Sequence, residues 1–240
     1  LDPSVPMKDS GVGWIGGVPT SWEVAKICLV ARLESGHTPS RQHPEYWVPE
    51  ECTTPWFSLA DIWQLRPGIQ EYVSETAERI SASGMANSAA RLLPAGTVVL
   101  SRTASVGFSG IMAQPMATTQ DFANWIPGPR LSSEFLLYGL RAMVSEFERV
   151  RYGSTHQTIY MPDIRRLTIP LPSREVQAAI VSALRAGLGR VDAAADRMRQ
   201  SVERLREYRQ ALITAAVTGQ IDVSDERAVA AHDERVESVA

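Results

Sequence analysis

REVQAAIVSALRAGLGRVDAAADRMRQSVERLREYRQALITAAVT, residues 174–218, is the segment that decides the fold of this chain. Apolar side chains recur in it at seven-residue intervals, and a second apolar row lies between them. The two rows are Leu184, Val191, Met198, Leu205 and Leu212, and Val181, Leu188, Ala195 and Val202. This spacing predicts the a and d positions of a heptad repeat, in which one helix packs against another. Arg209 occupies the next a position and interrupts the pattern.

The ends of this segment carry the signals of a helix start and stop. Pro172 cannot continue an upstream element, Ser173 can cap the first backbone N–H groups, Glu175 places negative charge in the first turn, and Gly219 favours a stop. Such a helix is roughly 65 Å long, far above the mean for globular proteins. We expect a partner helix to cover its apolar stripe; packing on its own domain is the alternative. The predicted interface positions are Leu184, Leu188, Val191, Met198, Val202, Leu205 and Leu212.

The residues before the helix predict an α+β domain with mixed strands and few helices. Strands are expected near residues 54–62, at 97–100 and within 117–127, and helices at 74–84 and 132–150. The predicted organisation is an extended lead-in over residues 1–19, a globular domain over 20–172, one long coiled-coil-forming C-terminal helix over 173–219, and a flexible acidic tail over 220–240.

Composition indicates an intracellular protein. Of the 240 residues 44% are apolar, which suffices for a real core, and no apolar stretch approaches the roughly 18 residues that span a bilayer. The N-terminus lacks the apolar region of a signal peptide, so a cytoplasmic location is expected. Two cysteines without CxxC spacing and four scattered histidines indicate neither a disulfide framework nor a zinc site.

The charge distribution differs between the tail and the rest of the chain. From Asp222 onward six acidic residues face two arginines, which gives −4, so the remaining chain carries +1 of the total −3. Only Lys8 and Lys26 are lysines among 24 basic residues. Arginine presents a planar donor fork that suits phosphate and the O6/N7 edge of guanine. A compositional bias of the genome accounts for the same preference.

Five segments together resemble the DNA specificity subunits of type I restriction-modification systems. They are KDSGVGWIGGVPTSWEV (8–24), SGHTPSR (35–41), LLPAGTVVLSRTASVGFSGI (92–111), YGSTHQTIYMPDIRRLTIPLPSREVQAAIVSAL (152–184) and EYRQALITAAVTGQIDV (207–223). The resemblance implies a target recognition domain that reads one half of a bipartite DNA site, followed by a spacer helix. It also implies docking to methyltransferase subunits, which carry the chemistry and use S-adenosylmethionine, and to restriction subunits through the complex.

The chain departs from this family in having one recognition domain and one long helix where two of each are usual. The sequence leaves three explanations open: a natural half-sized subunit, a truncated product, or a piece of a longer protein. A half-sized subunit can recover the missing half by forming a homodimer through antiparallel long helices, because a two-fold axis places equivalent domains at both ends. Such a dimer would read a symmetric, interrupted target in double-stranded DNA.

Two surface segments are the main candidates for DNA contact. Arg102 follows the strand at 97–100, where Ser101, Thr103 and Ser105 can donate to phosphate oxygens. The alternative for Arg102 is a solvated surface residue without a role in DNA binding, which is the commoner case for an arginine at the end of a strand. The second segment, residues 153–158, offers hydroxyl and amide groups, for which an ST-turn is the alternative. The candidates in this segment are Ser154, Thr155, His156 and Gln157. Arg151 and Gln120, outside the segment, are further candidates, and the polar loop 35–41 is a lesser one.

No catalytic motif accompanies these segments. The sequence lacks an (N/D)PPY-type methyltransferase motif, a carboxylate cluster with lysine for Mg²⁺, and a G-x-S-x-G elbow. We therefore expect a chain that is non-catalytic alone, without a metal or cofactor of its own. The alternative function is a coiled-coil adaptor whose globular head binds protein. A third is the recognition half of a fused restriction enzyme.

Overall fold

The computed structural model describes residues 4–153 and 157–221. The chain divides into two compact units, residues 1–182 and 183–240. The first unit is a sheet-rich α+β domain, and a long helix, α5 (Arg174–Val217), begins in it and makes up most of the second unit. The predicted fold class, an α+β domain followed by one long C-terminal helix, is confirmed.

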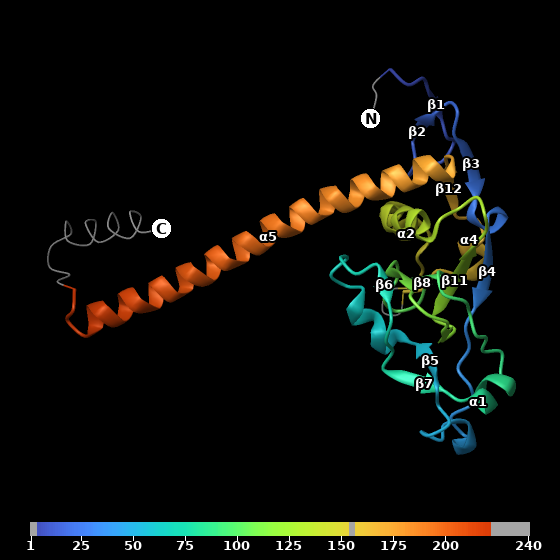
Figure 1. The fold of residues 1–240 in the computed structure, drawn as a ribbon, viewed down its shortest axis with the longest axis horizontal. Coiled ribbons are helices and arrows are strands. Elements are labelled where there is room, and N and C mark those ends of the chain that lie inside the picture. The colour runs from blue at the N-terminus through green and yellow to red at the C-terminus, as the bar shows by residue number, and fades with distance from the viewer. Residues whose placement is uncertain (1–3, 154–156, 222–240) are drawn as a thin grey trace. The chain divides into compact units, whose positions relative to one another are not determined.

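The centre of the domain is a five-stranded sheet in the order β4-β11-β8-β9-β6 (Figure 1). Its strands are β4 (Ala31–Ser35), β11 (Phe122–Pro127), β8 (Val98–Ser101), β9 (Ser109–Met112) and β6 (Tyr72–Val73). β6 runs parallel to β9, and the other pairs are antiparallel. The register places Trp125 of β11 opposite Leu33 of β4 and Val98 of β8, so this large side chain lies on an inner strand of the sheet.

Hydrophobic cores form on both faces of this sheet because successive side chains of a strand alternate between faces. Val98 and Leu100 face one core, which α2 (Ser133–Ala142) and α3 (Val144–Val150) cover. Val99 faces a second core that includes Phe57 and Phe122. The domain is therefore layered, with helices on one face and loops and a smaller sheet on the other.

The smaller sheet has the order β10-β5-β7, formed by β10 (Ala117–Thr118), β5 (Thr54–Phe57) and β7 (Glu78–Ile80). Short helices accompany it, namely η2 (Pro44–Tyr46), η3 (Leu59–Gln64) and α1 (Ala82–Ala86). Part of the segment expected to be a helix over 74–84 is thus strand β7, and that prediction was wrong. Antiparallel pairing of Thr54 with Ile80 extends this sheet, and tertiary pairing outweighs the local helical preference.

The N-terminal lead-in also differs from the expectation of an extended segment. β1 (Met7–Asp9) and β2 (Gly17–Pro19) pair as an antiparallel hairpin. Gly11 and Gly16 adopt φ of 70° and 65° in its loop, a conformation that glycine reaches without steric cost. The glycine-rich stretch therefore forms the turn of a hairpin.

Four further elements complete the domain. β3 (Glu23–Lys26) pairs with β12 (Thr168–Leu171), η1 (Ile27–Leu29) follows β3, and α4 (Met161–Ile164) precedes β12. The helix expected over 132–150 is two helices, α2 and α3, because Met143 leaves the helical region with ψ of 26°. Leu136, Leu140 and Phe147 of these helices are buried, whereas Val144 at the start of α3 is exposed.

The first turns of α5 pack on the domain as the local signals predict. Ser173 Oγ accepts a hydrogen bond from Val176 N at 3.4 Å. Hydrogen bonds from its own backbone N–H and from Ser173 lower the pKa of Glu175. Gln177 and Val181 are buried against the domain. The helix ends at Val217, and Gly219 beyond it adopts φ of 73°, as a helix stop requires.

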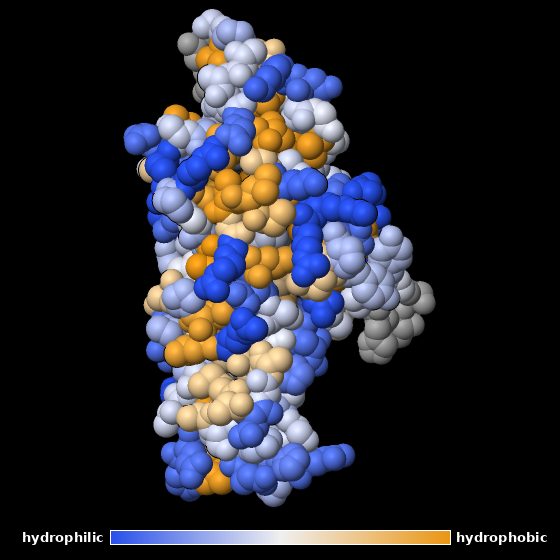
Figure 2. Space-filling model, turned by 90° about the vertical axis from the view of Figure 1, so that its right-hand side faces the viewer, coloured by the Kyte–Doolittle hydropathy of each residue, from blue (hydrophilic) through white to orange (hydrophobic). Residues whose placement is uncertain are grey.

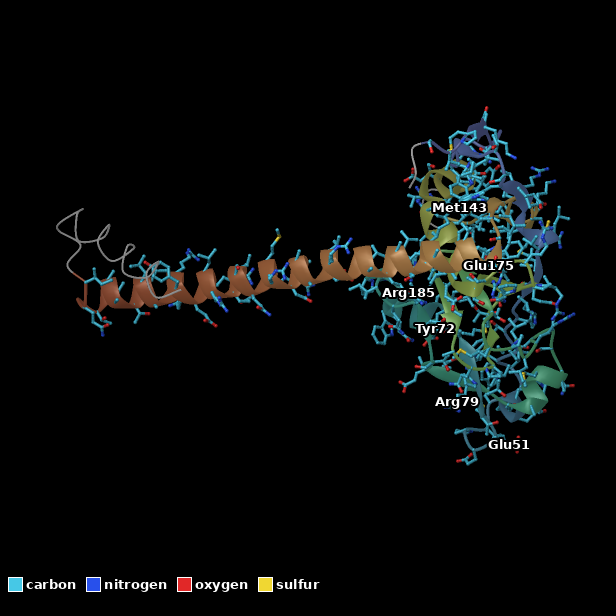
Figure 3. All side chains as sticks on the ribbon, turned by 45° about the horizontal axis from the view of Figure 1, so that its top comes forward. Glu51, Tyr72, Arg79, Met143, Glu175 and Arg185 are labelled. Carbon is cyan, nitrogen blue, oxygen red and sulfur yellow. The ribbon has the colours of Figure 1, made fainter. Side chains whose placement is uncertain are left out.

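The second unit leaves its apolar stripe exposed. Side chains of this part of α5 radiate from the helix (Figure 3). Among the predicted interface positions, Leu184, Leu188, Val191, Met198, Val202 and Leu205 are exposed and Leu212 is half-buried. Val191, Met198 and Leu205 reach exposed fractions of 63%, 70% and 65%, so the stripe is uncovered in the single chain. The coiled coil stays a prediction. Of the predicted tail, residues 220–240, all but the first two residues lie outside the described residues.

The surface of the molecule mixes apolar and polar side chains. Figure 2 shows one face, on which hydrophobic patches are interrupted by strongly hydrophilic side chains. Over residues 4–153 and 157–221, no helix combines the length and apolarity that a membrane crossing requires.

Candidate nucleic-acid interface

Arg102 lies where three chain segments meet. Its backbone N–H donates to the carbonyl of Asp121 at 2.9 Å, and its Nε donates to the carbonyl of Gln120 at 3.0 Å. Its Nη1 reaches the carbonyl of Ile159 at 3.5 Å, while Ile159 N donates back to the carbonyl of Arg102 at 2.8 Å. The guanidinium therefore holds the end of β8 against two segments that are distant in sequence.

The two segments singled out from the sequence lie side by side. Thr103 forms an isolated antiparallel bridge with Thr158, and Ala104 N donates to the carbonyl of Gln157 at 2.8 Å. Ala104 adopts φ of 60°, a left-handed conformation that is unusual for a residue with a Cβ. Three of the predicted positions, Ser154, Thr155 and His156, lie outside the described residues.

The Gln120 turn and the polar loop 35–41 join the same region. Thr38 Oγ1 donates to Gln120 Oε1 at 2.8 Å, and His37 N donates to the carbonyl of Thr118 at 2.9 Å. A Cβ on Gly36 would lie 2.2 Å from the Thr118 carbonyl oxygen, so only glycine permits this approach. Four loops predicted separately as DNA contacts are thus linked by hydrogen bonds into one surface, which we call the four-loop surface (residues 35–41, 101–107, 118–121, 151–153 and 157–159).

The predicted contact residues differ in accessibility. Gln120 and Arg151 are exposed, and Thr103, Ser105 and Gln157 are half-buried. Ser101 is fully buried, because the alternation along β8 places it on the same core-facing side as Val99. Its Oγ has no hydrogen-bond partner among the described residues. Ser101 is therefore not placed to reach a phosphate in this conformation.

Of the two arginines before the 153–158 segment, only one has a free charge. Arg149 forms hydrogen bonds of 2.6 and 2.9 Å with Glu146, and this contact lowers the pKa of the Glu146 carboxyl and raises that of Arg149. Arg151 has no hydrogen bond or ion pair to any of the described residues and is exposed. The net positive charge at this end of the surface therefore comes from Arg151.

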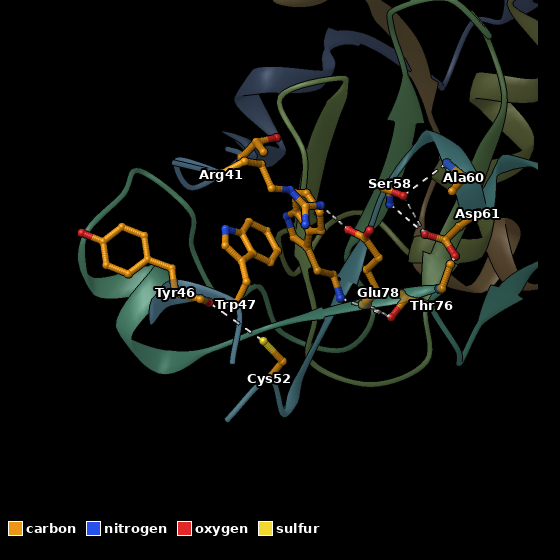
Figure 4. A network of polar contacts seen from close by, with 12 residues as sticks. Arg41, Tyr46, Trp47, Cys52, Ser58, Ala60, Asp61, Thr76 and Glu78 are labelled. Atoms are coloured by element: carbon orange, nitrogen blue, oxygen red, sulfur yellow. Dashed lines mark hydrogen bonds and ion pairs between the residues drawn. The ribbon is translucent and has the colours of Figure 1, made fainter. Parts of the chain in front are cut away.

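Sequence reasoning missed an aromatic clamp beside the polar loop. The Arg41 guanidinium carbon lies 3.7 Å from the centroid of the Trp47 ring and 5.5 Å from that of Trp56 (Figure 4). Arg41 Nη2 also lies 2.5 Å from Glu78 Oε2. Only the run of aromatic residues just after an arginine, in residues 41–47, signals such a site, and Trp56 and Glu78 are distant in sequence.

A second aromatic pair borders the four-loop surface. The rings of Tyr152 and Tyr160 lie 5.6 Å apart, and both side chains are 55% exposed. In the described part of the chain, no three His, Cys, Asp or Glu side chains are placed to hold a metal ion. What the surface offers is a set of hydroxyl, amide and guanidinium donors, the groups that bind phosphate oxygens and base edges.

Comparison with known proteins identifies the family of this chain. The family model described as the type I restriction modification DNA specificity domain matches residues 19–193. The specificity subunit of the type I restriction enzyme MjaIX of Methanocaldococcus jannaschii is 30% identical over 172 residues, covering 71% of this chain and 38% of that protein. The HindI specificity subunit of Haemophilus influenzae is 24% identical over 213 residues, covering 85% of this chain and 42% of that protein.

Solved structures share the fold. A chain in a structure described as the structural basis of complex assembly and conformational transition of the type I R-M system has a TM-score of 0.67 at 23% identity, covering 88% of this chain and 48% of that one. The HsdS subunit of Thermoanaerobacter tengcongensis has a TM-score of 0.58 at 22% identity, covering 78% and 41%. This chain spans less than half the length of the relatives it matches. It belongs to the family of type I restriction modification DNA specificity domains.

Proposed function

We propose that the domain over residues 20–172 reads one half of a bipartite target in double-stranded DNA, as the specificity component of a type I restriction-modification complex in the cytoplasm. The observation that carries this proposal is that hydrogen bonds link four polar loops in a member of this family, three of them at Arg102 and the fourth, loop 35–41, through Gln120. Loops held by a rigid sheet are the usual carriers of recognition residues. The linking hydrogen bonds place donors from distant segments on one surface.

The residues of the four-loop surface divide by chemistry. Thr103, Ser105 and Arg151 suit phosphate oxygens, contacts that position a protein without reading sequence. Gln120 and Gln157 carry amides that can form two hydrogen bonds with adenine N6 and N7. Arg102 donates from Nε and Nη1 to backbone carbonyls, so its role is to hold the reading loops and to add positive charge.

The long helix supplies the assembly surface in this proposal. The exposed stripe from Leu184 to Leu205 is the docking site for methyltransferase subunits, which bind S-adenosylmethionine, and restriction subunits join through them. This chain supplies recognition, and the methyltransferase and restriction subunits supply catalysis. If no second recognition domain is joined to this chain, two copies pair through antiparallel helices and read a symmetric, interrupted target.

The deciding experiment is selection of binding sites from a random duplex library by the tagged full chain, purified with the partners that copurify. We expect one preferred sequence and an affinity whose logarithm falls steeply with the logarithm of salt concentration, because phosphate contacts release counterions. A coiled-coil adaptor with a protein-binding head would show no preferred sequence, and that result would refute the proposal.

A further inference from the structure

Arg41 stacks on Trp47, lies near Trp56 and pairs with Glu78, and these three residues form the aromatic clamp. The Trp47 ring covers one face of the guanidinium at 3.7 Å, and Glu78 Oε2 takes a hydrogen bond from Nη2. The side chains of Arg41 and Glu78 are nevertheless 53% and 46% exposed. The clamp therefore fixes an arginine that remains in reach of a ligand.

The two tryptophans do not depend on Arg41 for their position. The indole N–H of Trp47 donates to the carbonyl of Ser40 at 3.2 Å, and that of Trp56 donates to the carbonyl of His37 at 3.3 Å. Trp56 is also buried in a core cluster against which Trp47 packs. The two tryptophans stabilise the loop without Arg41, and the Arg41 guanidinium packs on rings whose positions are set by these other contacts.

The magnitudes indicate that this contact orders the arginine more than it stabilises the fold. An exposed ion pair and an exposed cation–π contact each stabilise a fold only weakly. An unrestrained arginine has high rotamer entropy, and binding must otherwise overcome the loss of that entropy. A side chain ordered in advance loses less on binding. Its Nε and Nη1 have no hydrogen-bond acceptor among residues 4–153 and 157–221, so donors remain for a ligand.

An arginine can bind DNA phosphates through its charge or a base edge through its geometry, and the charge of the Arg41–Glu78 pair favours the second. The Arg41–Glu78 pair has no net charge, so it adds little to the general attraction of phosphates. A fixed planar fork buttressed by a carboxylate suits the paired O6 and N7 acceptors of guanine, whose recognition depends on geometry. The loop that carries Arg41 is joined to the four-loop surface by the hydrogen bond between Thr38 and Gln120.

We propose that Arg41 is a specificity-determining residue that reads a guanine in the DNA target through the major groove. This inference rests on the proposed function, which the wild-type protein tests separately. If wild-type protein selects no preferred sequence, the proposed function fails. If wild-type protein selects a sequence and the Arg41 variants select the same one at every position, only the present inference fails.

The test compares site selection by wild type, Arg41→Ala and Arg41→Lys, each as the full chain with copurifying partners. We expect Arg41→Ala to lose its preference for one G·C pair, with discrimination at that position falling about 5- to 150-fold. Preferences at the other positions should persist. Arg41→Lys keeps the charge but lacks the planar fork, so it should lose the same preference.

Arg79→Ala is the matched control. Arg79 is an exposed arginine next to Glu78 on β7, and its Nη1 donates to the carbonyl of Thr53 at 2.7 Å. This variant should keep the wild-type sequence preference. Retained preference in Arg41→Lys, or uniform weakening at all sequences in both Arg41 variants, would show a charge or structural role and overturn the inference. Should Arg41→Ala fail to fold in a thermal melt, Arg41→Lys alone decides.

Discussion

Thr38 Oγ1 donates a hydrogen bond of 2.8 Å to Gln120 Oε1 across 82 residues of sequence. This bond uses one of the two lone pairs of Gln120 Oε1 and holds the amide against loop 35–41, so the second lone pair and the NH₂ group stay available to a ligand. An amide whose oxygen is engaged in this way presents donors to a ligand in a defined orientation. The contact therefore links the polar loop 35–41 to the recognition chemistry of the 118–121 turn.

Replacing Gly36 with alanine should disrupt this link. The added Cβ would lie 2.2 Å from the Thr118 carbonyl oxygen and 2.3 Å from that of Thr119, and both are backbone atoms. The backbone must shift to relieve the overlap, at a cost of roughly 1–3 kcal/mol in the free energy of unfolding, as overpacking usually causes. Urea unfolding measures this change.

Gly13→Ala is the control for that variant. A Cβ on Gly13 meets no heavy atom within 4 Å, so its unfolding free energy should stay close to that of wild type. Equal stability of Gly36→Ala and Gly13→Ala would contradict the close approach between the polar loop and Thr118.

Gln157→Ala and Arg102→Ala should separate DNA contact from loop support. The carbonyl of Gln157, not its side chain, accepts the bond from Ala104, so Gln157→Ala should keep the wild-type melting temperature. Its affinity for the selected site should fall by about 1–3 kcal/mol if the amide meets a base. Arg102→Ala removes bonds to the carbonyls of Gln120 and Ile159, so it should lower both stability and affinity.

These outcomes are read by calorimetry and by binding to the selected duplex. Unchanged affinity in both variants would remove the two segments from the DNA site. A fall in the melting temperature of Gln157→Ala would assign that side chain a structural role instead.

Replacing Gln177 with leucine should destabilise the start of the long helix. Gln177 is fully buried; its Oε1 accepts from Ser132 N at 2.9 Å, and its Nε2 donates to the carbonyls of Arg130 and Pro172 at 2.8 and 2.9 Å. Leucine fills a similar volume but removes all three hydrogen bonds, of which the one to Pro172 is buried. A backbone group left unpaired away from water costs about 1–3 kcal/mol. A loss below 1 kcal/mol in urea unfolding would contradict this role.

Met198→Asp together with Leu205→Asp should abolish assembly while the domain stays folded. Both side chains are exposed in the single chain, so the substitutions cost the isolated chain little. In a helix–helix seam each would bury an unpaired carboxylate, which is strongly unfavourable. Light scattering and copurification of partners measure the effect.

Ala193→Asp with Gln200→Asp is the control for this pair. Both positions are exposed and lie on the f positions of the heptad, opposite the stripe, with the same change of charge. This control should assemble as wild type does. Assembly of the Met198/Leu205 variant at wild-type levels would refute the predicted seam.

The sequence by itself determined the long helix and the family. The bounds of α5 follow from Pro172, Ser173 and Gly219, because helix caps and stops act within a few residues of chain. The exposed stripe follows from heptad spacing for the same local reason. The candidate segments were also visible, since glycine, hydroxyl and amide residues mark surface loops wherever they lie.

Only the tertiary structure decided which of these segments meet and which side chains are usable. Residues 78–80 became strand β7 and the N-terminal glycine-rich stretch became a hairpin, because strand pairing depends on partners distant in sequence. Ser101 is no longer a candidate for DNA contact, because it lies on a core-facing side of β8 and is buried. Arg41 pairs with Glu78, which is 37 residues away in sequence, and local sequence signals do not show this contact. Local signals act within one segment, whereas burial and loop convergence arise only when separate segments pack together.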